Sequence, residues 1–112
     1  MKDKLKIINK IIELLSKHNC LQDIAFYYDD TRIHTFDGEL KTEFINISDY
    51  LSEYFDIEDY YIYMTFEGQF YDVINYGHKQ NCYIEFDKLL EDNKLYFELG
   101  EYWNMMIQRW YN

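Results

Sequence analysis

Two short histidine–cysteine pairs in this chain are of residue types that bind metals. His18 stands two residues before Cys20, and His78 stands four residues before Cys82. Together they would offer the nitrogen and sulfur ligands of a tetrahedral zinc site. The spacings match no usual zinc pattern, however, and a helix end running into a strand explains the first pair equally well. We therefore expect neither a metal nor any other cofactor.

A second group of residues is compatible with metal-dependent cleavage of phosphodiesters. Glu39-Leu-Lys41 follows Asp29, Asp30 and Asp37, which loosely resembles the carboxylate–carboxylate-x-lysine layout of restriction-type nucleases. In such a site acidic residues hold a metal ion that activates water, while the lysine stabilises developing charge. A nuclease must also approach phosphates, and so acidic a chain would repel them.

Other catalytic patterns have less support. The three serines, at positions 16, 48 and 52, lie in expected helices and form no nucleophile elbow. The four glycines are scattered, whereas a phosphate-binding loop needs them clustered. We therefore expect a protein that is not an enzyme.

Tyrosines interleaved with carboxylates are the more prominent chemical pattern, and most lie between residues 27 and 63. Tyrosine offers a rigid contact area with a polar tip, which suits protein interfaces. Arginine prefers aromatic faces and carboxylate forks as partners. The pattern is typical of a surface that binds an arginine-rich protein. Alternation along strands also requires that some of these tyrosines face a core.

The charge is unevenly distributed along the 112 residues, whose net charge is −10. Residues 1–19 hold five lysines and two acids, whereas residues 23–72 hold thirteen acids and two bases. Such a concentration costs folding free energy through self-repulsion. One interpretation of the acidic stretch is that it only keeps the protein soluble and reflects a compositional bias. The other is that it forms a docking surface for a basic partner. Direct binding to nucleic acid is disfavoured, because phosphates require lysine and arginine.

Composition also bounds the architecture. No apolar run approaches the ~18–20 residues of a membrane span, and two cysteines make no secreted disulfide framework. We expect a cytoplasmic protein that does not contact membranes. A chain of this length, with 48% hydrophobic residues, predicts a single α+β domain over residues 1–112.

The first half predicts a helix and a three-stranded meander. Apolar residues at helical spacing predict a helix over 3–18, with Asp3 as its N-cap. Residues 22–45 predict three strands, the first half-buried, with turns at 29–30 and at Asp37-Gly38. This register pairs Arg32 with Glu43 and turns Ile33 and Leu40 toward the core.

The second half predicts further helices and strands. A short helix is expected from residue 46 or 48 to 55, with a ridge of carboxylates at Asp49, Glu53 and Asp56, and then a central strand over 60–66. Residues 69–76 favour a short helix ending at Gly77, although a return strand fits almost as well. Residues 82–92 predict a helix and 95–99 a strand. Residues 103–110 favour a final helix, with a strand as the alternative. The expected fold is a small antiparallel sheet, the meander plus one or two strands, packed with the N-terminal helix and short C-terminal helices.

In its size, its net negative charge and its interleaved tyrosines and carboxylates, the chain resembles the small acidic inhibitors made by phages and mobile elements, including anti-CRISPR proteins and antirestriction DNA mimics. The resemblance implies a stoichiometric inhibitor whose acidic, tyrosine-rich face occupies the basic nucleic-acid-binding groove of a defence nuclease such as Cas9. The residues expected at that face come from charge clustering alone: Asp29, Asp30, Asp37, Glu39, Glu43, Asp49, Glu53, Asp56, Glu58, Asp59, Tyr50 and Tyr61.

Two other functions fit the same sequence. An immunity or antitoxin-type protein would also be small and acidic, and it would plug the active site of a toxin nuclease. A regulatory or structural phage protein is the third possibility, as a homodimer formed through Trp103, Met106 and Trp110. The sequence does not choose between a monomer and a homodimer.

Overall fold

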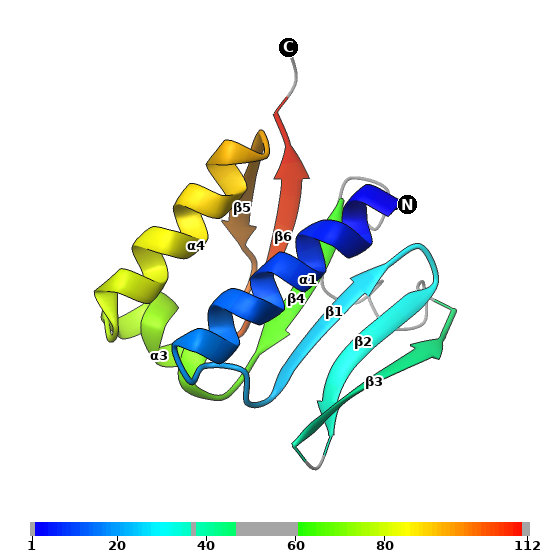
Figure 1. Cartoon of the computed structure of the whole chain (residues 1–112), viewed down its shortest axis with the longest axis horizontal. Coiled ribbons are helices and arrows are strands. Elements are labelled where there is room, and N and C mark those ends of the chain that lie inside the picture. Colours follow the sequence, from blue (N-terminus) through cyan, green and yellow to red (C-terminus); the bar gives the residue numbers. More distant parts are fainter. Residues whose placement is uncertain (1, 37, 47–60, 111–112) are drawn as a thin grey trace.

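The computed structural model of the chain describes residues 2–36, 38–46 and 61–110. Its strands form a six-stranded antiparallel sheet in the order β3-β2-β1-β4-β6-β5, and α1 and α4 lie side by side across one face of it (Figure 1). The α+β architecture predicted from the sequence is confirmed. The elements occur in the order α1 (Lys2–Lys17), β1 (Ile24–Tyr28), β2 (Thr31–Phe36), β3 (Glu39–Phe44), β4 (Ile62–Phe66), α3 (Gln69–Tyr76), α4 (Gln80–Asp92), β5 (Leu95–Leu99) and β6 (Asn104–Arg109).

The first helix forms where the apolar periodicity predicts it. Ile8, Ile11 and Leu15 are fully buried on one side of α1, facing the sheet. The helix begins at Lys2, so Asp3 is not its N-cap; it lies in the first turn, where a carboxylate still interacts favourably with the helix dipole. Asn19, with a φ of 57°, ends the helix in the left-handed conformation.

The meander has the predicted register, since β2 and β3 pair Arg32 with Glu43 and Phe36 with Glu39. Ile33 is buried as expected. Leu40 was expected to face the core, but its side chain is 44% exposed. The reason is that β3 is an edge strand that the helices do not reach, so all six of its residues are exposed (Figure 1).

The strand β1 is buried on both faces rather than half-buried as predicted. Ile24 and Phe26 belong to the main core under the helices, while Ala25 and Tyr27 form a second cluster with Tyr63 on the opposite face. The alternation is present in the sequence, but both sets of side chains are apolar or aromatic. A central strand of a sheet can be buried in this way.

The short helix α3 is confirmed over residues 69–76, and Gly77 ends it with a φ of 69°. A row of aromatic rings joins α3 and α4 to the sheet. The rings of Phe66 and Phe70 are 5.4 Å apart, and that of Phe86 lies 5.1 Å from Phe70 and 5.6 Å from Phe97.

For residues 103–110 the structure shows the strand, the alternative to the final helix: β6 occupies this segment and gives the sheet one strand more than expected. It lies between β4 and β5, with Met105 and Ile107 fully buried under the helices. Met106 packs against the second cluster on the other face. A strand with apolar residues on both faces has no alternation, so its pattern also fits a helix.

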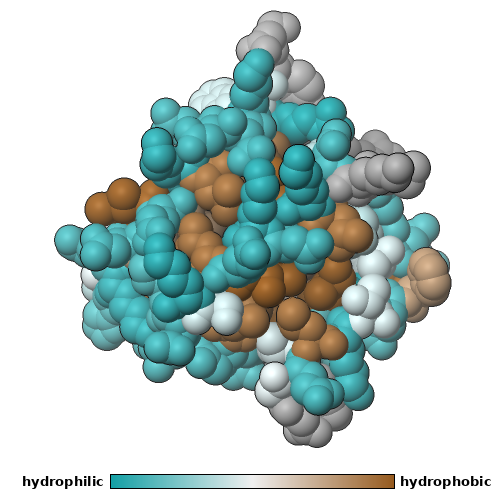
Figure 2. Space-filling model, in the orientation of Figure 1, coloured by the Kyte–Doolittle hydropathy of each residue, from teal (hydrophilic) through white to brown (hydrophobic). Residues whose placement is uncertain are grey.

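The surface of the face that carries the helices is mostly hydrophilic, and apolar side chains reach it in patches near its centre (Figure 2). In the described part of the chain no helix combines the length and the apolar character that crossing a bilayer requires.

Candidate functional site

The exposed edge of the sheet holds two of the predicted acids. Glu39 and Glu43 stand near the two ends of β3, about 13 Å apart at the usual rise of a strand. Because side chains alternate, these acids share one face of the strand, while Leu40 and Phe44 lie on the other. Phe44 is 93% exposed. The edge therefore presents carboxylates on one side and apolar groups on the other.

Glu43 is held by neighbours on the same face of the meander. Its Oε1 accepts a hydrogen bond of 2.9 Å from Arg32 and lies 3.5 Å from Nε2 of His34. The Arg32 guanidinium also lies over the Tyr27 ring and donates to its hydroxyl at 3.2 Å. Burial alone would lower the pKa of Arg32, but the bond to Glu43 and the contacts with Tyr27 outweigh it and raise the pKa. This network confirms the predicted cross-strand pair.

The β1–β2 turn holds two further acids, Asp29 and Asp30. Asp29 and Asp30 both have positive φ, at 43° and 57°, which aspartate tolerates better than most residues. Asp29 accepts a hydrogen bond of 2.7 Å from Nζ of Lys4 on α1. The carbonyl of Asp30 receives the amide of Ile45, at 3.0 Å, which closes this end of the meander. The turn thus lies beside Glu43 and Phe44.

Tyr61, one of the two tyrosines expected at the binding face, lies against two cations and near the acids Asp3 and Asp29. Nζ of Lys4 lies 5.3 Å from the centre of its ring and the guanidinium of Arg109 lies 4.5 Å from it. Burial raises the pKa of Tyr61, and the nearby Arg109 opposes that shift. Tyr61 directly precedes β4, two strands away from the hairpin of β2 and β3.

The remaining predicted residues lie outside the described part of the chain: Asp37, Asp49, Tyr50, Glu53, Asp56, Glu58 and Asp59. The helix expected over 46–55 lies mostly outside it as well. In the sequence these stretches, residue 37 and residues 47–60, hold six acids and no lysine or arginine, which is more than half of the net charge of −10.

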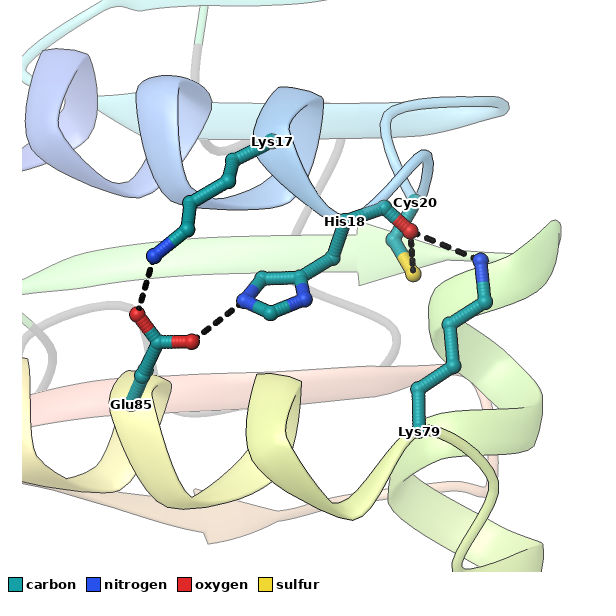
Figure 3. Close-up of polar contacts among 5 residues, drawn as sticks. All are labelled: Lys17, His18, Cys20, Lys79 and Glu85. Atoms are coloured by element: carbon teal, nitrogen blue, oxygen red, sulfur yellow. Dashed lines mark hydrogen bonds and ion pairs between the residues drawn. The ribbon is translucent and has the colours of Figure 1, made fainter.

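Two of the four residues considered for zinc, His18 and Cys20, instead take part in a clasp of polar contacts between the end of α1 and the start of α4 (Figure 3). Glu85 accepts a hydrogen bond of 2.8 Å from Lys17, and its other oxygen is 2.5 Å from Nε2 of His18. Lys79 donates to the carbonyl of His18 at 2.7 Å, and the thiol of Cys20 donates to the same carbonyl at 3.4 Å. The bonds from Lys17 and His18 lower the pKa of Glu85.

This clasp has the geometry of a structural contact. Cys20 and Cys82 are both fully buried. Burial, followed by the contacts with Cys20, raises the pKa of the Cys82 thiol to about 12, so it is protonated and a poor nucleophile. Among residues 2–36, 38–46 and 61–110, no three His, Cys, Asp or Glu side chains are grouped so that they could hold a metal ion.

The sequence interpretation missed the contacts between distant residues. Lys4 and Asp29 are 25 positions apart, and His18 and Glu85 are 67 apart. No spacing pattern reveals such pairs. Comparison of the chain with protein-family models, curated proteins and solved structures found no match.

Proposed function

We propose that the chain is a stoichiometric, non-catalytic inhibitor that binds the basic, nucleic-acid-binding surface of a partner protein. The partner class is a defence nuclease such as Cas9. The observation that carries this proposal is the edge strand β3, whose six residues are all exposed and combine acidic with apolar side chains. This edge would dock through Glu39, Leu40 and Phe44.

An uncovered edge strand supports a binding role, because it leaves backbone donors and acceptors available to another protein. Proteins usually shorten, cover or charge such edges to avoid unwanted pairing. Here the apolar side of β3 includes Phe44, whose ring is almost fully exposed. Exposed aromatic residues of this kind are frequent anchors of protein interfaces.

Charge supports the choice of partner. The acids of residues 23–72 would attract a cationic surface and steer association, and a groove that holds nucleic acid is lined by lysine and arginine. In the hairpin itself, Glu39 makes no ion pair with any residue that the structure describes, whereas Glu43 is paired with Arg32. We therefore expect Glu39 to contribute more to binding than Glu43.

The test uses two matched double variants of the full chain. Glu39→Gln with Phe44→Ser removes one acid and one exposed aromatic residue from β3. Glu98→Gln with Tyr102→Ser removes the same two types from the opposite end of the sheet, where both residues are exposed. Both variants have the same net charge, so they differ only in which surface is changed.

The readout is inhibition of DNA cleavage by guide-loaded Cas9, together with the affinity for that complex at low and high salt. We expect the β3 variant to weaken binding about tenfold or more, as for loss of interface anchors, with the control within about twofold of the unmodified chain. Affinity should fall as salt rises. Absence of binding to Cas9, or equal weakening by both variants, would contradict the proposal.

A further inference from the structure

A cavity of about 370 Å³ opens at the end of the molecule that is made by the first turns of α1, the α4–β5 turn and the end of β6. In Figure 1 this is the region where the start of α1 approaches the last strand. Three cations from these three places line it, namely Lys6, Lys94 and Arg109. We propose that this cavity is a binding site for a nucleotide of about the size and charge of a nucleoside monophosphate.

The charge of the cavity is opposite to that of the chain. Its three cations and one acid, Asp3, give the lining a net charge of +2, although the whole chain has −10. Within the described residues, the lysines and arginines in ion pairs are not among the lining residues: Lys4, Lys17, Arg32 and Lys88. Lys4 is close to the cavity, over the Tyr61 ring, but it is paired with Asp29. Cations that converge without carboxylate partners favour an anion between them. The N-terminal end of α1 adds a positive partial charge.

Strand pairing fixes the backbone of two of the three cation residues, Lys94 and Arg109. Leu95 and Arg109 are partners in the β5–β6 register, and the amide of Trp110 donates to the carbonyl of Lys94 at 3.0 Å. The guanidinium of Arg109 rests on the ring of Tyr61, 4.5 Å from its centre. A cation held in this way loses little conformational freedom on binding a phosphate, and guanidinium matches the geometry of phosphate oxygens.

An aromatic side chain supplies the part of the site that would hold the nucleobase, beside the cations that would hold the phosphate. Trp110 lines the cavity, and its side chain is 57% exposed although its ring packs against Tyr96, with 4.6 Å between ring centres. The exposed part of an indole ring is a platform on which a nucleobase stacks. The cavity volume lies in the usual range for small-molecule sites. A phosphate monoester carries about −1.5 to −2 charges at neutral pH, which matches the lining.

The experiment titrates the full chain with AMP, GMP, CMP and UMP, and with adenosine and inorganic phosphate as probes of the two halves. Trp103→Phe leaves Trp110 as the only tryptophan, so quenching of its fluorescence reports the cavity directly. Calorimetry on the unmodified chain checks that this substitution does not alter binding. We expect saturable binding of at least one monophosphate, with adenosine and phosphate about tenfold weaker or more.

Matched variants locate the site. Lys6→Gln with Arg109→Gln should weaken the bound nucleotide about tenfold or more. Lys10→Gln with Lys88→Gln makes the same change of net charge outside the cavity and should leave the affinity within about twofold. Asp3→Asn should tighten binding, since it removes the acid from the lining.

Three results would overturn the proposal. They are the absence of saturable binding by any of the four monophosphates, equal affinity for a monophosphate and for adenosine or phosphate, and equal weakening by both double variants. The proposal goes beyond the protein-binding function and is independent of it, because the β3 variants leave the cavity unchanged.

Discussion

Cys20 and Cys82 illustrate how position decides the chemistry of a side chain. As free residues in a sequence they could be ligands, nucleophiles or core residues. The structure buries both completely, where the pKa of Cys82 rises from 9.0 to about 12. His18, two residues before Cys20, forms its side-chain hydrogen bond with Glu85 and not with a thiol. These cysteines therefore act as small core residues.

The buried thiols should be unreactive in the folded protein. At about pH 8 an alkylating reagent attacks only the thiolate. Burial keeps the reagent away from both thiols, and the raised pKa of Cys82 also makes its thiolate scarce. We expect labelling of both cysteines to be at least ~1,000-fold slower than in the denatured chain, because it requires unfolding. Mass spectrometry of iodoacetamide-treated protein measures both rates. Rapid labelling in the native state would show that this part of the core opens locally.

At the scale of the elements, the join between β4 and α3 depends on a residue without a side chain. A Cβ atom added at Gly68 would lie 2.5 Å from the carbonyl oxygen of Gln22. That contact is with backbone, so it cannot be relieved by a change of rotamer. The amide of Glu67 also donates to the carbonyl of Asp23 at 3.1 Å, which holds the two segments together.

Gly68→Ala should therefore destabilise the fold. We expect a loss of about 1–3 kcal/mol in the free energy of unfolding, as for other substitutions that overfill a packed site. Glu67→Ala is the control, since Glu67 is exposed and its loss should change stability by no more than about 0.5 kcal/mol. Urea denaturation of the three proteins measures the differences. A neutral Gly68→Ala would mean that the two segments separate easily.

The sequence predicts the elements whose neighbours are close along the chain. The meander register follows from Asp37-Gly38 and the alternation beside it, and α3 follows from its apolar face and Gly77. The sequence does not identify β6 as a strand, because burial on both faces removes the alternation of apolar and polar residues that marks one. For the candidate site the sequence identifies the acids, but not that Lys4 pairs with Asp29 or that two cations lie against the ring of Tyr61.

For the whole molecule the dominant physical fact is the charge of −10 on a small fold. Self-repulsion among the acids opposes compaction, and salt screens it over a Debye length of about 8–10 Å. The exposed ion pairs, such as that of Lys88 with Asp92, contribute little to the folding stability, so salt can remove little stabilisation by screening them.

Stability should consequently rise with ionic strength. We expect the melting temperature to increase by several degrees between about 0.05 and 0.5 M sodium chloride, because screening removes more repulsion than attraction. Differential scanning calorimetry measures the change, and the Lys10→Gln with Lys88→Gln variant, which is more acidic, should respond more strongly. A melting temperature that falls with salt would show that the ion pairs outweigh the self-repulsion.

The place of β6 between β4 and β5 also has a consequence for biosynthesis. Among the described residues, β6 is the strand that joins β5 to the rest of the sheet, and it is translated after both of its neighbours. Until it is translated, β4 keeps one side open and β5 has no partner strand. The sheet of the described residues therefore cannot close before residues 104–109 are translated, and until then a chaperone would meet an unfinished hydrophobic interior.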